Sequence, residues 1–213
     1  MQDCLKDGST CFQYADDTTV LLHAPPKDLK DCVNRMNNTL QSIESWAADS
    51  NLLLNETKTK QMLATTRQMS RVHDLGDYTP PLSLKTKIVD RVDRFRLIGT
   101  LLSQDLKWTE HVNNVTSSCF GVLAVLKKIK NMTLQETKKS PVQSLVLSKL
   151  NFNDKVTFPL PMFLRKRMQR VQNAAAGFVL NRYCSEEDVL NLGWLPTLEN
   201  TQLNITTTTG LNT

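Results

Sequence analysis

The first clear pattern along the chain is a pair of short runs in which apolar and polar residues alternate, with two acidic residues between them. The runs are Phe12–Tyr14 and Thr18–Leu22, and Asp16 and Asp17 lie between them. Alternation with a period of two indicates strands, because successive side chains of a strand point to opposite faces of a sheet. We therefore predict a strand, a tight turn and a second strand over residues 10–23.

Farther along, apolar residues recur at steps of three and four, which is the spacing of one face of an α-helix. Such stripes run from Leu29 to Ala47, from Val112 to Ile129, and from Leu164 to Phe178. The sequence Thr133-Leu134-Gln135-Glu136 has capping-box spacing and predicts one more helix. Pro141 should kink that helix or delay its start, because proline has no backbone N–H to donate. We assign these stripes to core packing.

Shorter apolar runs predict further strands between the first two helical stripes. Residues Met62–Ala64 are expected to form a strand, and residues 82–92 a hairpin of undefined register. Phe95–Leu102 has the pattern of one buried strand, in which Gly99 would permit a close approach of another backbone segment.

This distribution of patterns predicts an α+β protein with two regions. Residues 1–104 combine strands with one long helix. Residues 105–200 are expected to be helical and to end in a short helix capped by Ser185 with Asp188 and stopped by Gly193. Residues 201–213 contain a run of threonines with poor helix propensity, and we expect this tail to be disordered.

Composition excludes several classes of protein. Of the 213 residues, 40% are hydrophobic and 22% are charged, which are globular values. No apolar run reaches the 18 or so residues of a membrane span, and the N-terminus lacks a secretory hydrophobic region. Five widely spaced cysteines without a C-x-x-C pattern indicate neither a zinc site nor a disulfide framework. We therefore expect a cytoplasmic or nuclear protein that is not secreted, with no membrane partner.

Basic residues are concentrated in one part of the chain. Residues 104–182 carry 13 basic and 4 acidic side chains, whereas residues 1–103 carry 13 of each. Clustered Lys and Arg supply the phosphate attraction that dominates non-specific nucleic-acid affinity. The alternative for any one cluster is a solvated helix face. Besides Lys138-Lys139, the candidate nucleic-acid-binding residues are Lys127, Lys128, Lys130, Arg165, Lys166 and Arg170.

Other residues with chemical potential are better explained by packing. Trp46, Trp108 and Trp194 each border an apolar stripe and are expected to anchor the core rather than to stack on bases. His111 lies beside Trp108 without a nearby catalytic or metal-binding pattern, and we interpret it as a structural histidine.

The adjacent carboxylates of Asp16 and Asp17 carry the chemistry of the first region. Magnesium prefers hard oxygen ligands and is usually held by one or two carboxylates together with substrate phosphates. A hairpin tip that presents two carboxylates could supply such ligands. The alternative is a solvated turn, since aspartate is common in turns for local reasons.

The pattern Tyr14-Ala15-Asp16-Asp17 with its apolar flanks resembles the central palm motif of reverse transcriptases, in the form found in non-LTR (LINE-type, jockey/CR1-like) retrotransposons. The similarity continues in the family's order over residues 3–200. The further motifs are Asn55-Glu56-Thr57-Lys58-Thr59-Lys60, Phe95-Arg96-Leu97-Ile98-Gly99 with Leu106-Lys107-Trp108-Thr109-Glu110-His111, Gln169-Arg170-Val171-Gln172-Asn173-Ala174, and Leu192-Gly193-Trp194-Leu195-Pro196.

The resemblance implies a fold and a set of roles. It implies a partial polymerase palm followed by a helical thumb and connector, with Mg²⁺-dependent nucleotidyl transfer in the parent family. Asp16 and Asp17 would be catalytic metal ligands, and Lys58 would lie near the incoming triphosphate. The partners would be an RNA or DNA template–primer and a deoxynucleoside triphosphate, with Mg²⁺ and no small-molecule cofactor.

The family places a strand with another catalytic aspartate before the Tyr-Ala-Asp-Asp hairpin, and only thirteen residues precede Tyr14 here. Two-metal phosphoryl transfer draws its carboxylates from more than one strand. We therefore expect weak or absent Mg²⁺ binding and no polymerase activity from this chain alone. The alternatives are a non-catalytic nucleic-acid-binding remnant and a decayed open reading frame with no cellular role.

Overall fold

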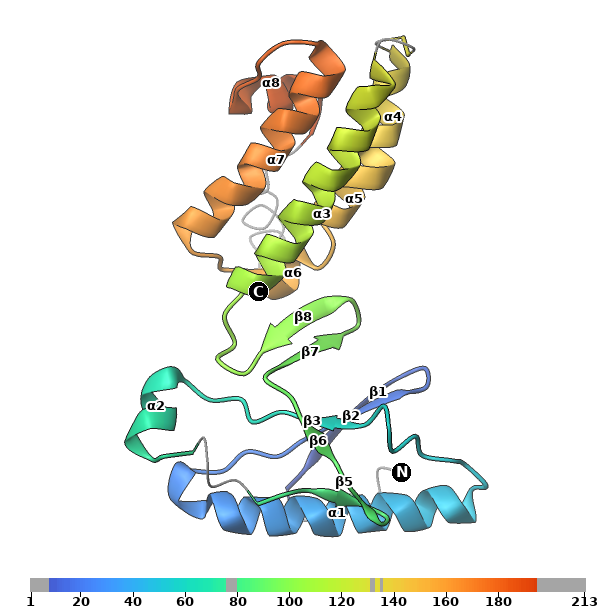
Figure 1. Cartoon of the computed structure of the whole chain (residues 1–213), viewed down its shortest axis with the longest axis vertical. Helices are drawn as coiled ribbons and strands as arrows, with labels where there is room; N and C mark the ends of the chain where they lie inside the picture. The colour runs from blue at the N-terminus through green and yellow to red at the C-terminus, as the bar shows by residue number, and fades with distance from the viewer. Residues whose placement is uncertain (1–7, 76–79, 131–132, 135, 195–213) are drawn as a thin grey trace, which may run out of the picture. The chain divides into compact units, whose positions relative to one another are not determined.

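A computed structural model describes residues 8–75, 80–130, 133–134 and 136–194 of the chain (Figure 1). Helices and strands are both well represented, which confirms the predicted α+β class. The tail over residues 201–213, expected to be disordered, lies outside the described residues. Gln135 of the predicted capping box lies outside them as well.

The chain divides into two compact units. The first, the hairpin unit, comprises the described residues up to Phe95 together with Ser103–Leu106. The second, the helical unit, comprises Arg96–Leu102 and the described residues from Lys107 onward.

The hairpin unit begins with the predicted strand, turn and strand. Strands β1 (Thr10–Tyr14) and β2 (Asp17–Leu21) are antiparallel, and Tyr14 pairs with Asp17, so the turn has only two residues between them. A short 3-10 helix, η2 (Pro26–Asp28), leads into helix α1 (Leu29–Asp49). The α1 stripe is confirmed, since Val33, Ile43 and Ala47 are buried.

Three further pairs of strands follow in the chain, and each forms a separate two-stranded sheet. Strands β4 and β5 form the hairpin predicted between residues 82 and 92, with Ser83 paired to Ile88, and β4 packs beside α1. The parallel pair β3–β6 joins Lys60 to Asp90. The bounds are β3 (Lys60–Gln61), β4 (Ser83–Leu84), β5 (Lys87–Ile88), β6 (Asp90–Arg91), β7 (Arg94–Leu97) and β8 (Thr100–Ser103).

Two strand predictions were wrong. Met62–Ala64 lies outside β3, whose pairing with β6 ends at Gln61. Phe95–Leu102 is not one buried strand but the hairpin β7–β8, because Ile98 and Gly99 both have positive φ and reverse the chain. Helix α2 (Arg67–Val72) was not predicted, although Thr66 caps it by accepting a hydrogen bond from Met69 N.

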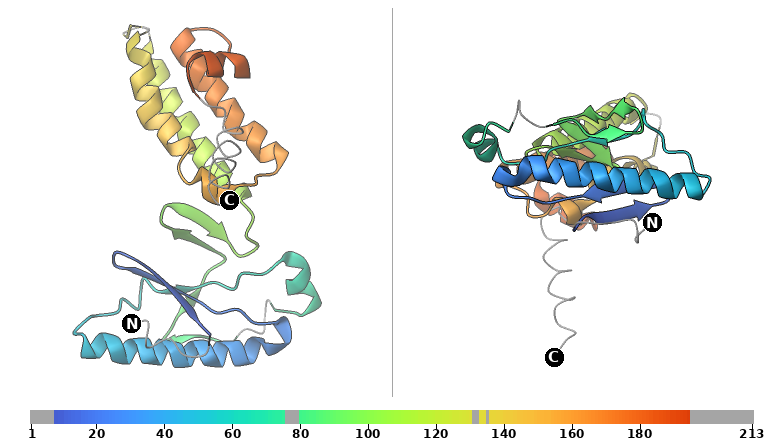
Figure 2. Two further views of the ribbon diagram at one scale, coloured as in Figure 1. Left: turned by 180° about the vertical axis from the view of Figure 1, so that it is seen from behind. Right: turned by 90° about the horizontal axis from the view of Figure 1, so that it is seen from below.

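The helical unit is built around three long helical segments, which lie side by side in Figures 1 and 2. Helix α3 packs against α7 and against a continuous segment made of α4, the π-helix η5 and α5. The bounds are α3 (Thr109–Lys128), η4 (Glu136–Lys138), α4 (Lys139–Val142), η5 (Gln143–Leu147), α5 (Ser148–Leu150), α6 (Asp154–Thr157), α7 (Met162–Leu180) and α8 (Glu186–Asn191).

The late start expected after Pro141 is not observed, because α4 begins two residues before it. Helix α4 begins at Lys139, so Pro141 lies in its first turn, where a missing N–H leaves no internal hydrogen bond unmade. The capped last helix is confirmed, because Asp188 accepts a hydrogen bond from the Ser185 backbone N–H. Gly193 has φ +73° and follows that helix.

The main hydrophobic core lies within the helical unit. The α7 stripe is fully buried, and it packs with residues of α3, with the segment from α4 to α5, and with Trp194. The buried apolar side chains of the hairpin unit are few by comparison: Val33, Ile43, Ala47, Leu75, Leu84 and Val89. None of the described helices is both long and apolar enough to span a bilayer.

Candidate metal-binding hairpin and basic helices

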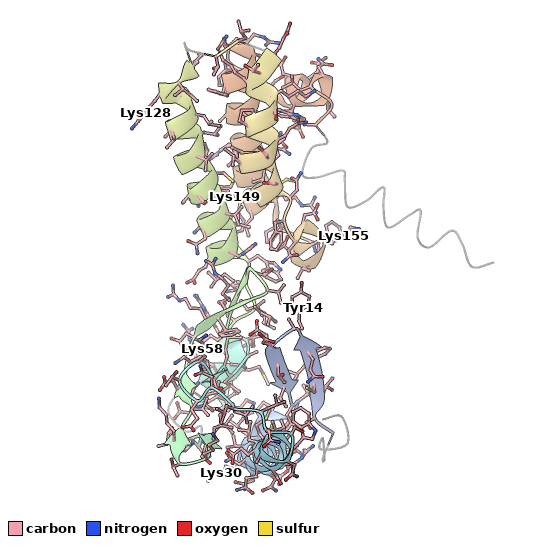
Figure 3. All side chains as sticks on the ribbon, turned by 90° about the vertical axis from the view of Figure 1, so that its right-hand side faces the viewer. Tyr14, Lys30, Lys58, Lys128, Lys149 and Lys155 are labelled. Carbon is pink, nitrogen blue, oxygen red and sulfur yellow. The ribbon has the colours of Figure 1, made fainter. Side chains whose placement is uncertain are left out.

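The β1–β2 hairpin presents Asp16 and Asp17 to solvent. Asp16 lies in the two-residue turn, and Asp17 is the first residue of β2, opposite Tyr14. Both aspartates are exposed, and the exposed Tyr14 lies at the hairpin tip in Figure 3. The aspartates are therefore accessible to a ligand rather than engaged in the core.

The turn is held in an uncommon backbone conformation. Ala15 has φ +49°, a left-handed value that costs an alanine about 1–2 kcal/mol relative to the right-handed region. Two-residue hairpin turns need positive φ at their first central position, which glycine or asparagine provides more easily.

One face of the hairpin carries three exposed apolar side chains. The register places Phe12, Tyr14 and Leu21 on the same face as Asp17, because cross-strand partners share a face. The exposed fractions of these side chains are 58% for Phe12, 63% for Tyr14 and 55% for Leu21. The carboxylate of Asp17 thus borders an uncovered apolar surface.

Lys58 lies in a turn that is organised by Asn55. The Asn55 side-chain oxygen accepts hydrogen bonds from Lys58 N at 3.1 Å and from Thr57 Oγ1 at 2.8 Å. Its backbone oxygen accepts from Thr59 N and Thr59 Oγ1. This is the local pattern by which asparagine stabilises turns, so the spacing of Asn55 and Lys58 has a structural reason.

The two lysines of this loop differ in their surroundings. Lys60 Nζ donates to Asp90 Oδ2 at 2.6 Å, and the hydrogen bond and positive charge of Lys60 lower the pKa of the Asp90 carboxyl. Lys58 is exposed, and within the described ranges its ammonium group has no ion-pair partner. Of the two lysines, Lys58 is therefore the one whose positive charge is available to a ligand.

Asp16 and Asp17 are neighbours in the sequence, and the structure does not pair either of them with Lys58. Throughout the part of the chain that the structure describes, no hydrogen bond or ion pair links Lys58 to either aspartate. In that same part, no group of three or more His, Cys, Asp or Glu side chains is placed to hold a metal ion. The hairpin therefore presents two adjacent, exposed carboxylates.

The six candidate nucleic-acid-binding residues fall into two groups. Lys127, Lys128, Lys166 and Arg170 are exposed on α3 and α7, and Figure 3 shows Lys128 projecting outward from α3. Lys130 and Arg165 are half-buried. Arg165 donates from Nε to Leu160 O at 2.9 Å and lies 5.7 Å from the Phe158 ring centroid, so it also supports the start of α7. Arg167 is a further exposed cation of the same helix.

Lys138, which belongs to the predicted basic surface, is buried with 4% of its surface exposed. Its Nζ donates to Asn181 Oδ1 at 3.1 Å and stands 5.7 Å from the Phe178 ring centroid. The prediction that Lys138 forms part of a phosphate-binding cluster was wrong, because its ammonium group is buried in the helical unit and donates to Asn181.

The structural interpretation of His111 and two of the tryptophans is confirmed. His111 is buried, and its Nδ1 accepts a hydrogen bond from Leu101 N at 3.2 Å. Burial, together with the nearby charge of Arg96, lowers the pKa of His111 below 6.5. Trp194 is buried in the core of the helical unit, and the partly buried Trp108 packs against this core. Cys11, Cys32, Cys119 and Cys184 are free thiols.

The contacts at the β7–β8 turn, around Gly99, were predicted only in part. A Cβ atom at Gly99 would lie 2.8 Å from Phe152 Cε1, so the close neighbour is an aromatic side chain and not the backbone predicted there. Asn153 was not singled out, yet its Nδ2 donates to Ile98 O at 3.3 Å and to Thr100 Oγ1 at 2.5 Å. The sequence Asn151-Phe152-Asn153 is a turn signal, but it does not reveal which segment it contacts.

Comparison of the chain with protein-family models, with curated proteins and with solved structures found no match.

Proposed function

We propose that the chain is part of a reverse transcriptase of the non-LTR retrotransposon type, with the β1–β2 hairpin as its metal-binding element. The observation that carries the proposal is the hairpin itself. Its register puts Asp16 in the turn and Asp17 opposite Tyr14, both carboxylates are exposed, and the strained residue between the strands is Ala15. The resemblance of the motifs quoted above supports the family, and the exposure of both carboxylates supports their use as metal ligands.

The donor set fits Mg²⁺ in part. Magnesium is commonly held by one or two protein carboxylates and completes its shell with water and substrate phosphates. Asp16 and Asp17 would hold the ion, which when bound offsets the charge of a triphosphate. Lys58, exposed on a turn that Asn55 holds in place, would bring a positive charge to the same substrate.

Catalysis is expected to need more than these residues. A two-metal site stabilises both the attacking and the leaving oxygen, and it takes carboxylates from more than one strand. The hairpin contributes two. We therefore propose weak metal binding and no primer extension by this chain alone, and synthesis on a primed RNA template with Mg²⁺ would contradict the proposal of inactivity.

A direct test uses Mn²⁺ as a paramagnetic probe of the hairpin, read as broadening of backbone amide signals in NMR spectra. The chain provides a matched control, because Glu186 and Glu187 are also adjacent, exposed carboxylates. At substoichiometric Mn²⁺, the signals around Asp16 and Asp17 should broaden before those around the glutamate pair.

The double variant Asp16→Asn/Asp17→Asn should lose this selective broadening and keep the amide spectrum of the rest of the chain, since both side chains are exposed. Equal broadening at the aspartate and glutamate pairs would show ordinary surface binding and would refute a metal-binding role for the hairpin.

A second candidate function, nucleic-acid binding by the helical unit, rests on the exposure of Lys166, Arg167 and Arg170 on one helix. Each phosphate contact contributes about −0.9 to the slope of log K against log salt for duplex DNA. Lys166→Gln/Arg170→Gln should reduce that slope by about 2. The control Lys27→Gln/Lys87→Gln removes the same charge from exposed positions of the hairpin unit and should leave the slope unchanged. A slope near zero for the unaltered chain would exclude this function.

A further inference from the structure

A small cavity lies in the hairpin unit, away from the aspartate pair in sequence. Its volume is about 160 Å³, and it is lined by Thr65, Arg67, Ser70, Arg71, Gln104 and Asp105. All six side chains are polar or charged. A cavity of this composition is suited to a polar ligand rather than to an apolar one.

The two segments that form the cavity are tied together by backbone hydrogen bonds. Thr65 N donates to Gln104 O at 2.8 Å, and Gln104 N donates to Asp93 O at 2.8 Å. On the other side, Thr66 caps α2, and Ser70 N donates to Thr66 O at 2.9 Å. The lining residues are therefore held by regular local structure.

The charges of the lining favour an anion. Arg67 Nε contacts Asp105 Oδ2 at 3.2 Å, and the Asp105 carboxylate also accepts from Ser103 Oγ at 2.7 Å. The positive charge of Arg67 thus balances the negative charge of this carboxylate, whose side chain is only 13% exposed. Arg71 lies four residues after Arg67 on α2, and its guanidinium has no acceptor within the described residues. The site therefore keeps one uncompensated positive charge.

The donors present match a phosphate group. Guanidinium groups bind phosphate oxygens through paired N–H donors, and hydroxyl and amide groups provide the remaining contacts. Thr65 and Ser70 offer hydroxyls, and Gln104 offers a side-chain amide. At about 160 Å³ the cavity is smaller than the roughly 300–1,000 Å³ of small-molecule sites, so it suits one compact group.

We propose that this cavity binds a phosphate group, with Arg71 and Arg67 as its charged ligands and Ser70 and Gln104 as polar ones. The phosphate would be either a free anion or one unit of a nucleic-acid strand. The site is independent of Asp16 and Asp17 and does not rest on the function proposed above.

The test is a titration of the full chain with inorganic phosphate, followed by NMR through the backbone amides of Ser70, Arg71 and Gln104. Chloride at the same ionic strength serves as the reference. Saturable shifts at these amides with phosphate and not with chloride are expected. Arg71→Ala should weaken binding at least about tenfold, because it removes the charge-assisted hydrogen bonds of the guanidinium to the phosphate oxygens. Arg71→Lys should retain part of the affinity, since it keeps the charge but not the paired donors.

Two controls separate this site from general attraction. Lys27→Ala removes one exposed positive charge elsewhere in the same unit and should leave phosphate affinity unchanged. Asp16→Asn/Asp17→Asn should also leave it unchanged, so loss of the proposed metal site and loss of this site are distinguishable. Arg71 is exposed, and unchanged far-UV circular dichroism of its variants would show that the fold is intact.

A short single-stranded oligonucleotide distinguishes the two sources of phosphate. Shifts at the same amides at lower oligonucleotide than phosphate concentration, weakened by Arg71→Ala, would assign the site to a strand phosphate. Shifts with inorganic phosphate alone would assign it to a free anion. The proposal fails if neither probe shifts these amides, if chloride shifts them equally, or if Arg71→Ala binds as tightly as the unaltered chain.

Discussion

Lys138 puts an ammonium group inside the helical unit, and one side chain supplies its hydrogen-bond acceptor. Its Nζ lies 3.1 Å from Asn181 Oδ1, and the Phe178 ring offers a weaker contact. A buried charge that loses its partner costs far more than an exposed one. We therefore predict that the stability of the helical unit depends on the pairing of Lys138 with Asn181.

The clean perturbation is Asn181→Gly. Asn181 ends α7 with φ +58°, and glycine accepts that conformation without steric cost, so the substitution removes the amide alone. Loss of a hydrogen bond to a charged group should lower the free energy of unfolding by about 1.5–3 kcal/mol. Lys138→Met replaces the cation with an apolar chain of similar length and should change stability by less than about 1.5 kcal/mol.

The assay is a double-mutant cycle in urea, followed by far-UV circular dichroism. In the Lys138→Met background, Asn181→Gly should cost less than in the unaltered chain, with a coupling of at least about 1 kcal/mol. Lys139→Met, at the half-buried neighbour, is the matched control and should be additive with Asn181→Gly. Additivity between Lys138→Met and Asn181→Gly would refute the reasoning.

Three further predictions concern single residues. Because burial lowers the pKa of His111, the free energy of unfolding should be highest above about pH 6.5 and should fall as the pH drops through the folded pKa. Urea unfolding at pH 7.5 and 5.0 measures this change. The same pH dependence in His111→Asn would contradict the prediction. Ala15→Gly should raise the free energy of unfolding by about 1 kcal/mol by relieving the left-handed φ, and a loss of stability would argue against this turn. Gly99→Ala should destabilise by more than about 1 kcal/mol in thermal unfolding, because φ is +78° and the new Cβ meets Phe152; partial recovery in combination with Phe152→Leu would assign the steric share of the loss.

Elements set by local periodicity were predictable from the sequence. The stripe of α7 and the alternation around Asp16 and Asp17 each follow from the geometry of one element, and both are confirmed. The capping of α8 by Ser185 and Asp188 is equally local. In each case a short window of sequence contains all the residues that determine the outcome.

Features that depend on a distant partner were not predictable in this way. Lys138 reads as part of a basic cluster because Lys139 is next to it, but Asn181, 43 residues later, decides its environment. The β7–β8 hairpin reads as one buried strand because its turn residue Ile98 is apolar. Asn153, which contacts Ile98 and Thr100, comes from a turn more than 50 residues away.

The candidate metal site and the main hydrophobic core belong to different units, and this separation has a consequence for experiments. The core cluster lies in the helical unit, whereas the hairpin that carries Asp16 and Asp17 is two-stranded and exposes Phe12, Tyr14 and Leu21. A two-stranded hairpin is marginally stable by itself. The hairpin should therefore open locally at a lower free energy than the helical unit, as weakly packed segments generally do. Substitutions at its tip thus test metal binding without disturbing the core, and substitutions such as Asn181→Gly test the core without altering the aspartates.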